Sequence, residues 1–191
     1  MIASNTTAVG HDALRELTTG YWNTGFGYQS GMNNTTAIGN TAVGFYALKA
    51  NVTGNYNTAL GKGALASNTT QLNTAVGYNC LTTNTSGNSN VGMGYLALTS
   101  NTTASQNTAI GVQALTANTT GAYNTALGYQ TLDANTTGTR NVGVGNHALG
   151  ANTEGEKNVA VGMNTLKSNT TGDFNIGVGD TALTANTTGD H

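Results

Sequence analysis

Apolar and polar residues follow a single pattern of 17 residues that repeats along the whole chain. The segment Asn124-Thr-Ala-Leu-Gly-Tyr-Gln-Thr-Leu132 is preceded 17 residues earlier by Asn107-Thr-Ala-Ile-Gly-Val-Gln-Ala-Leu115. The units begin at Thr6, Asn23, Asn40, Asn57, Asn73, Asn90, Asn107, Asn124, Asn141, Asn158 and Asn175, and one residue is missing around Thr70-Gln71-Leu72. Recurrence at a short fixed period is typical of a solenoid. We therefore expect residues 1–191 to form one repetitive segment of eleven coils, without a domain boundary.

Within a unit, alternation of small and large residues predicts a strand. The consensus, numbered 1 to 17, is Asn-Thr-Ala-Val-Gly-Tyr-x-Ala-Leu-x-x-Asn-Thr-Thr-Gly-x-x. Position 3 is only Ala or Gly and position 4 is a larger apolar residue, so positions 2 and 4 share one face and positions 3 and 5 share the other. Units this short, rich in Gly, Thr and Asn, are poor candidates for helix pairs.

The expected fold is therefore all-β, a parallel β-solenoid whose coils stack about 4.8 Å apart. Two stretches of each unit, positions 1 to 5 and about 11 to 14, are β-compatible. Position 9 is Leu in ten units, which predicts a second buried corner. Positions 4 and 9 are separated by five and then twelve residues, which argues against a three-sided prism of hexapeptides.

Position 5 is glycine in every unit, which predicts a positive φ or a close approach of neighbouring chain segments. These structural turn glycines are Gly10, Gly27, Gly44, Gly61, Gly77, Gly94, Gly111, Gly128, Gly145, Gly162 and Gly179.

Composition excludes several classes of function. The chain has 6 Lys or Arg, scattered from Arg15 to Lys167, and a net charge of −2, so we expect no nucleic-acid partner. Apolar runs are far shorter than the roughly 18 residues of a membrane-spanning helix, so no membrane insertion is expected. The first residues lack the pattern of a secretory signal, and the single Cys80 excludes an internal disulfide framework.

The apolar residues at position 4 predict self-association. One chain can bury its Leu ladder inside its own coil, whereas the strand face that bears Val9, Val43, Val76 and Val161 needs an apolar surface opposite. We therefore expect association along the rod axis, most simply as a homotrimeric fibre.

The Asn-Thr-Ala-Val-Gly core, which residues 73–77 copy without change, resembles the head repeats of trimeric autotransporter adhesins of the YadA type. The full pattern, with Ala114-Leu115 followed by Asn118-Thr-Thr-Gly121, looks more like repeats of phage tail fibre and tail-fibre-domain proteins. The resemblance covers nearly the whole chain. It implies a trimeric shaft or head on a virion or cell surface, which projects or attaches to a host receptor or glycan. No stalk, membrane anchor or C-terminal chaperone domain is recognisable, and the repeats stop in phase at His191, so we expect a fragment of a longer fibre protein.

Catalytic chemistry has little support, and we expect neither an enzyme nor a cofactor. Pairs such as Gly143-Val-Gly145 only reflect glycine at positions 3 and 5 and do not open a dinucleotide loop. His11 and His147 belong to distant coils and His191 ends the chain, so no shared metal or nucleophile is expected. A hexapeptide-type transferase would need a cleft His and a three-by-six coil. Cys80 stands where Ala is usual and is expected to be a buried, inert thiol.

Three hypotheses concern Asn and Thr. Position 12 opens Asn-x-Thr/Ser sequons, so a glycan-coated extracellular filament is one alternative, and an Asn ladder or a turn is the other. The Thr pairs, such as Thr119-Thr120, also permit an ice-binding array, although Val52 and Glu154 interrupt the row. The sequons begin at Asn34, Asn51, Asn68, Asn84, Asn101, Asn118, Asn135, Asn169 and Asn186.

Two further groups are local. Position 16 is acidic in Glu156, Asp173 and Asp190, which could form a charge network with Arg140 and Lys157 or, more weakly, a calcium site. Aromatic residues gather at positions 6 and 17, where they could cover a seam between chains or contact glycans. The glycan candidates are Tyr28, Tyr78, Tyr95, Tyr129 and Trp22.

Overall fold

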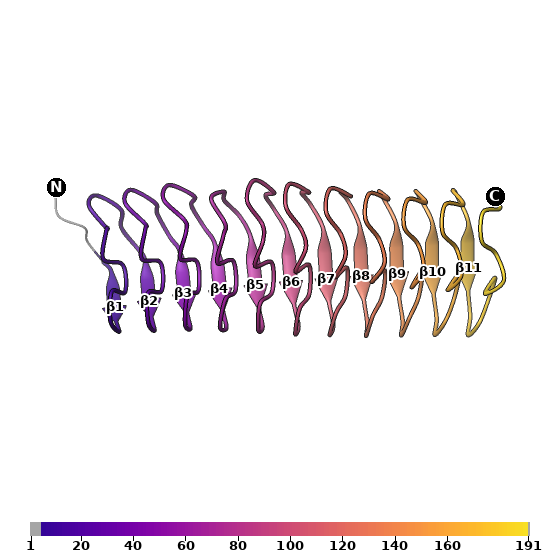
Figure 1. Cartoon of the computed structure of the whole chain (residues 1–191), viewed down its shortest axis with the longest axis horizontal. Coiled ribbons are helices and arrows are strands. Elements are labelled where there is room, and N and C mark those ends of the chain that lie inside the picture. Colours follow the sequence, from indigo (N-terminus) through magenta and orange to yellow (C-terminus); the bar gives the residue numbers. More distant parts are fainter. Residues whose placement is uncertain (1–4, 191) are drawn as a thin grey trace.

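A computed structural model describes residues 5–190 as a straight rod of stacked coils (Figure 1). Each coil contributes one three-residue strand, and all eleven strands form a single parallel sheet in chain order. The strands are β1 (Thr7–Val9), β2 (Thr24–Phe26), β3 (Thr41–Val43), β4 (Thr58–Leu60), β5 (Thr74–Val76), β6 (Val91–Met93), β7 (Thr108–Ile110), β8 (Thr125–Leu127), β9 (Val142–Val144), β10 (Val159–Val161) and β11 (Ile176–Val178). The described residues contain no helix, so the all-β parallel solenoid is confirmed.

Identical repeat positions stack directly on one another. In the pair β7 and β8, Ala109 lies opposite Ala126 and Ile110 lies opposite Leu127. Strand residues at position 3 face the interior, whereas those at position 4 face outward: Ala126 is fully buried and Leu127 is 45% exposed. The predicted alternation of the two strand faces is therefore confirmed.

The second predicted strand, at positions 11 to 14, is wrong. In that stretch the backbone N–H groups of Thr119, Thr120 and Gly121 all donate to one acceptor, the carbonyl oxygen of Thr136 in the next coil, over 3.0, 3.2 and 3.3 Å. In a strand, successive backbone N–H groups point to opposite sides of an extended chain and so cannot share one acceptor. Three donors can converge only where the chain turns tightly, so this corner keeps hydrogen bonds along the rod without extended backbone.

Left-handed backbone conformations shape every coil. Positions 7, 9 and 17 have φ near +55°, as in Gln113 (58°), Leu115 (52°) and Tyr123 (63°). Such conformations are uncommon for residues other than glycine and each costs about 1–2 kcal/mol. Their repetition in register shows that stacking imposes the conformation at these three positions, coil after coil.

The apolar interior is a thin layer between the strand and the Leu corner. It consists of three ladders: Ala or Gly at position 3, small residues at position 8 and Leu at position 9, where Leu48 through Leu166 are fully buried. Small residues at position 3 leave room for the Leu side chains: a Cβ added to Gly25 would lie 2.9 Å from Cγ of Leu14. The predicted buried Leu corner is confirmed.

Coil 4, residues 57–72, accommodates the missing residue at one corner. Thr69 keeps the position-13 hydrogen bond from its N–H to the carbonyl oxygen of Thr85, 3.3 Å. Thr70 supplies the carbonyl oxygen that position 15 supplies elsewhere, accepting from Nδ2 of Asn57 and Asn68 at 2.7 and 2.8 Å. Coil 4 therefore lacks position 14, and the register recovers by Asn73.

Candidate functional site

The position-5 glycines form the tight turn after each strand. All eleven have φ between 119° and 147°. A Cβ added to Gly111 would overlap the carbonyl group of Gly128 in the next coil. Backbone conformation and lack of space both demand glycine here, which gives these residues the turn role that the sequence predicts.

Asparagines at position 12 form a buried ladder along the rod. Asn118 donates from Nδ2 to Oδ1 of Asn101 over 3.0 Å and to the carbonyl oxygen of Gly121 over 2.9 Å. N-glycosylation would require the same Nδ2 atom to be exposed. Of the sequon residues proposed as glycosylation sites, Asn68, Asn101, Asn118, Asn135 and Asn169 are fully buried, and Asn186 is half-buried in the last coil. The geometry thus matches the Asn-ladder alternative.

A second buried ladder, at position 1, was missed by sequence reasoning. Asn107 accepts at Oδ1 from the backbone N–H of Asn124 over 2.8 Å, and Nδ2 of Asn124 donates to the carbonyl oxygen of Gly138 over 2.8 Å. The same carbonyl accepts Nδ2 of Asn135 at 3.0 Å, so the two ladders meet at position 15. The near-invariance of Asn at position 1 is the sequence feature that could have revealed this ladder.

The hydroxyl groups of threonines at position 13 donate hydrogen bonds to backbone carbonyl oxygens of the next coil. Oγ1 of Thr119 donates to the carbonyl oxygen of Thr136 over 3.1 Å, and the same bond recurs along the row, for example from Thr136 to Thr153 over 3.1 Å. Threonines at position 14, such as Thr120, remain exposed. The row at position 14 lacks a member in coil 4 and contains Glu154, so the Thr array suggested for ice binding is discontinuous.

Aromatic side chains at position 6 stack along the rod axis. The ring of Tyr28 lies between His11 and Phe45, with centroid distances of 5.4 and 5.2 Å. Tyr78 stacks on Tyr95 at 5.5 Å. A sugar ring that packs against an aromatic residue needs an open ring face. Tyr28 has none, Tyr78 lies between Tyr95 and Nζ of Lys62, which is 5.5 Å from its ring centre, and one face of Tyr95 is covered by Tyr78.

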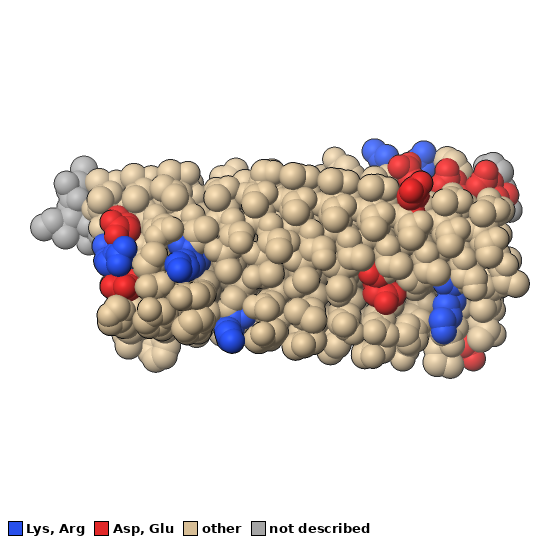
Figure 2. Space-filling view, viewed as in Figure 1, with Lys and Arg blue, Asp and Glu red and all other residues tan. Residues whose placement is uncertain are grey.

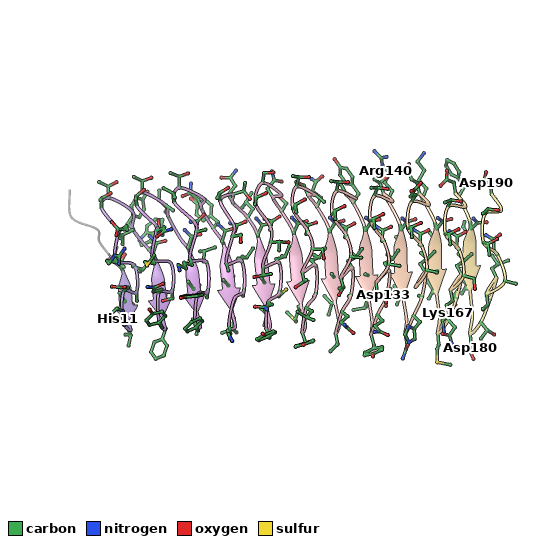
Figure 3. All side chains as sticks on the ribbon, viewed as in Figure 1. His11, Asp133, Arg140, Lys167, Asp180 and Asp190 are labelled. Carbon is green, nitrogen blue, oxygen red and sulfur yellow. The ribbon has the colours of Figure 1, made fainter. Side chains whose placement is uncertain are left out.

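The other two glycan candidates are not part of a stack. Tyr129 meets His147 edge to face at 5.5 Å. Trp22, at position 17, is 58% exposed and meets the neighbouring Tyr21 edge to face at 4.8 Å. The five candidates therefore do not gather at one place, since positions 6 and 17 lie at opposite edges of the rod. Figure 3 shows this separation: His11 and Asp180 at position 6 lie along the lower edge, and Arg140 at position 17 and Asp190 at position 16 lie along the upper edge.

Exposed apolar residues at positions 4 and 6, here called the apolar stripe, follow the rod from β1 to β11. Charged side chains are few on the face in Figure 2, and they lie mainly toward the two ends, with a broad uncharged stretch between. The exposed members of the stripe are Val9, Phe26, Tyr28, Phe45, Leu60, Tyr78, Met93, Tyr95, Val112, Leu127, Tyr129, Val161, Met163 and Val178.

The carboxylates of Asp173 and Asp190 at position 16 accept hydrogen bonds from backbone N–H groups of the preceding coil. Asp173 accepts the N–H of Glu156 at 2.6 Å, and Asp190 accepts the N–H of Asp173 at 2.8 Å. The nearby cations lie over aromatic rings: Lys157 is 4.4 Å from the ring centre of Phe174. Residues 5–190 contain no group of three or more His, Cys, Asp or Glu side chains that could hold a metal ion.

The remaining candidates are Cys80 and the histidines. Cys80 is fully buried, and burial raises the pKa of its thiol to about 12, so the thiol is protonated at neutral pH. His11 lies 3.3 Å from the carboxylate of Asp12 in the first coil, far from His147, and His191 lies outside the described residues. Within residues 5–190, the two described histidines belong to coils 1 and 9 and are not brought together.

The chain matches no protein-family model, and comparison with curated proteins and with solved structures finds no significant match. Across residues 5–190, no helix with the length and hydropathy of a membrane span is present.

Proposed function

We propose that this chain is a structural and adhesive fibre segment whose rods associate side by side, as a homotrimer, through the apolar stripe. The single observation that carries the proposal is that every coil except coil 9, where Val144 is half-buried, contributes at least one exposed apolar residue to the stripe. An apolar surface this long is unusual on a monomeric soluble protein and is typical of an interface.

The stripe has the geometry of an interface between straight, parallel elements. Position 4 contributes one branched or long apolar side chain per coil, at the spacing of the coils, about 4.8 Å. Leu60, Met93 and Leu127 are each 44–46% exposed in the single chain. Packing rods in register would bury like residues against like, which a cyclic homo-oligomer does by symmetry.

The resemblance of the repeats to those of phage tail fibres and trimeric adhesins supports the same proposal and supplies a location. We place the fibre on a virion tail or on a bacterial cell surface, where a rigid rod would project a binding part toward a host. Interior Asn ladders and axial stacking suit this role because they stiffen the rod from within.

Assembly mass tests the proposal directly. Light scattering of the wild-type protein should give three times the chain mass of 19.3 kDa. The double variant Ile110→Asp with Leu127→Asp should be monomeric, since carboxylates buried at a seam without partners are strongly unfavourable.

Circular dichroism distinguishes loss of assembly from loss of folding. Both side chains point outward from the sheet, so the variant chain should keep the wild-type β spectrum. The matched control, Gln113→Asp with Gln130→Asp, changes position 7 of the same coils and should assemble normally. A monomeric wild type, or an assembled position-4 variant, would overturn the proposal and favour the ice-binding alternative, for which thermal hysteresis is the assay.

A further inference from the structure

The shortened coil 4 lies beside a surface notch. Where coil 4 lacks position 14, a cavity of about 270 Å³ opens between coils 3, 4 and 5. It is lined by Thr53, Gly54, Thr69, Thr70, Gln71 and Asn88. In the regular coils the position-14 residue, usually threonine, lies at this corner. The notch is the space that this residue would fill.

The notch offers unused hydrogen-bonding groups. Within the described chain, the side-chain amides of Gln71 and Asn88 and the hydroxyl of Thr53 make no hydrogen bond. An amide carries both donors and acceptors, and a hydroxyl carries both in one atom. Three residues with such groups therefore line one opening.

The buried structure beside the notch is incompletely satisfied. Asn68 donates from Nδ2 to the carbonyl oxygen of Thr70 over 2.8 Å, the bond that position 12 makes to position 15 in the regular coils. Oδ1 of Asn51, in the preceding coil, has no hydrogen-bond partner although Asn51 is fully buried, whereas Oδ1 of Asn68 accepts from Nδ2 of Asn84 over 2.7 Å. An unpaired buried acceptor of this kind is rare in native proteins, but Asn51 does not line the notch, so the proposal below rests on the lining side chains alone.

The chemistry of the lining selects the kind of ligand. No charged residue lines the notch, so neither an anion nor a metal ion would find a counter-charge there. Its exposed groups are amides and hydroxyls, which exclude a purely apolar ligand. The volume lies just below the roughly 300 Å³ at which pockets for drug-sized molecules begin, so the space suits a single ring.

We propose that this notch binds one neutral hexopyranose unit through the side chains of Thr53, Gln71 and Asn88. The inference goes beyond the fibre role and does not depend on it, because positions 13 to 16 lie away from the apolar stripe. A few hydrogen bonds at an open site predict a weak complex, with a dissociation constant on the order of 1 mM.

Saturation-transfer NMR with methyl glycosides of glucose, galactose and mannose is the first test. At least one of the three should receive saturation from the wild-type protein. Insertion of one Thr between Thr69 and Thr70 restores a coil of 17 residues, fills the notch and should abolish the transfer. Dextran, a neutral glucose polymer, serves as a second probe. If dextran competes with the bound glycoside, the ligand is a unit of a polysaccharide. If dextran does not compete, the ligand is a free monosaccharide.

Point variants keep the test independent of how the insertion folds. Gln71→Ala with Asn88→Ala should weaken binding at least tenfold, whereas Gln113→Ala with Gln130→Ala, an amide pair outside the notch, should leave it unchanged. Equal binding by the wild type and the Gln71/Asn88 variant would overturn the proposal, as would the lack of transfer to all three glycosides at high millimolar concentration. Light scattering on the same samples reports the assembly state separately, so failure of sugar binding and failure of the fibre proposal are distinguishable.

Discussion

Asn135 donates from Nδ2 to Oδ1 of Asn118 across 2.8 Å, although the two residues belong to different coils. Asn118 in turn donates to Asn101, so the amides form a continuous chain inside the rod. In a low-dielectric interior such hydrogen bonds are strong, and leaving one partner unsatisfied is costly. The polar ladder is therefore part of the core of this fold, together with the Leu ladder.

Breaking the ladder should be strongly destabilising. Asn118→Leu leaves the buried Oδ1 of Asn101 without its donor and removes one of the two acceptors of Nδ2 of Asn135, which keeps only the carbonyl oxygen of Gly138. We expect a loss of about 2–5 kcal/mol in the free energy of unfolding. Chemical denaturation measures it, with Thr120→Ala on the exposed row as the control. A Leu variant as stable as that control would show that the ladder contributes little.

Glycine at position 5 should be irreplaceable. Gly111→Val places a branched side chain at a φ of 140° and against the carbonyl group of Gly128, so we expect a loss of 3 kcal/mol or more, roughly the upper end of backbone strain costs. Gly150→Ala is the matched control, because a Cβ there meets its nearest atom, the carbonyl oxygen of His147, at 3.3 Å and needs no positive φ. Comparable melting temperatures for the two variants would contradict the turn assignment.

The left-handed positions offer a route to higher stability. Gln106, at position 17, is exposed and has a φ of 61°. Asn tolerates this conformation better than Gln, and a β-branched residue tolerates it least. Gln106→Asn should therefore raise the free energy of unfolding by a few tenths to about 1 kcal/mol, and Gln106→Val should lower it by about as much. The reverse order in thermal melts would argue against stored backbone strain.

The half-buried carboxyl of Asp133 should make stability depend on pH. Burial raises its pKa above the ordinary value of 3.8, with His147 and Lys167 opposing the shift. At pH values between 3.8 and the raised pKa of Asp133, the folded chain binds more protons than the unfolded chain. The free energy of unfolding therefore falls as the pH rises through that range. Asp133→Asn removes this dependence. Its melting temperature relative to wild type should be higher at neutral pH than below pH 3.8, and a constant difference would contradict the prediction.

Period and strand position could be predicted from the sequence because stacking makes every coil obey the same steric rule. The alternation of small and large residues at Ala126 and Leu127 placed the strand and its faces correctly. The predicted second strand failed because Thr and Asn are compatible both with strands and with turns. Only the convergence of three N–H groups on Thr136 decides between them.

The left-handed columns at positions 7, 9 and 17 were not predicted, since Leu and Tyr disfavour that conformation. Each column nevertheless contains a glycine in one coil: Gly63, Gly31 and Gly39, all with positive φ. Such isolated glycines in otherwise bulky columns were the available sequence clue. The notch could not be placed from the sequence, because the shortened unit Asn68-Thr69-Thr70-Gln71-Leu72 can be aligned with the consensus in several ways.

Because each strand pairs in register with only its immediate neighbours, the number of repeat units sets the length of the rod. Adding or removing one complete unit, such as residues 107–123, changes the length of the rod by about 4.8 Å and leaves the remaining coils with equivalent partners. Duplication and loss of units can thus adjust the reach of such a protein in fixed steps, without a new core having to be invented at any length.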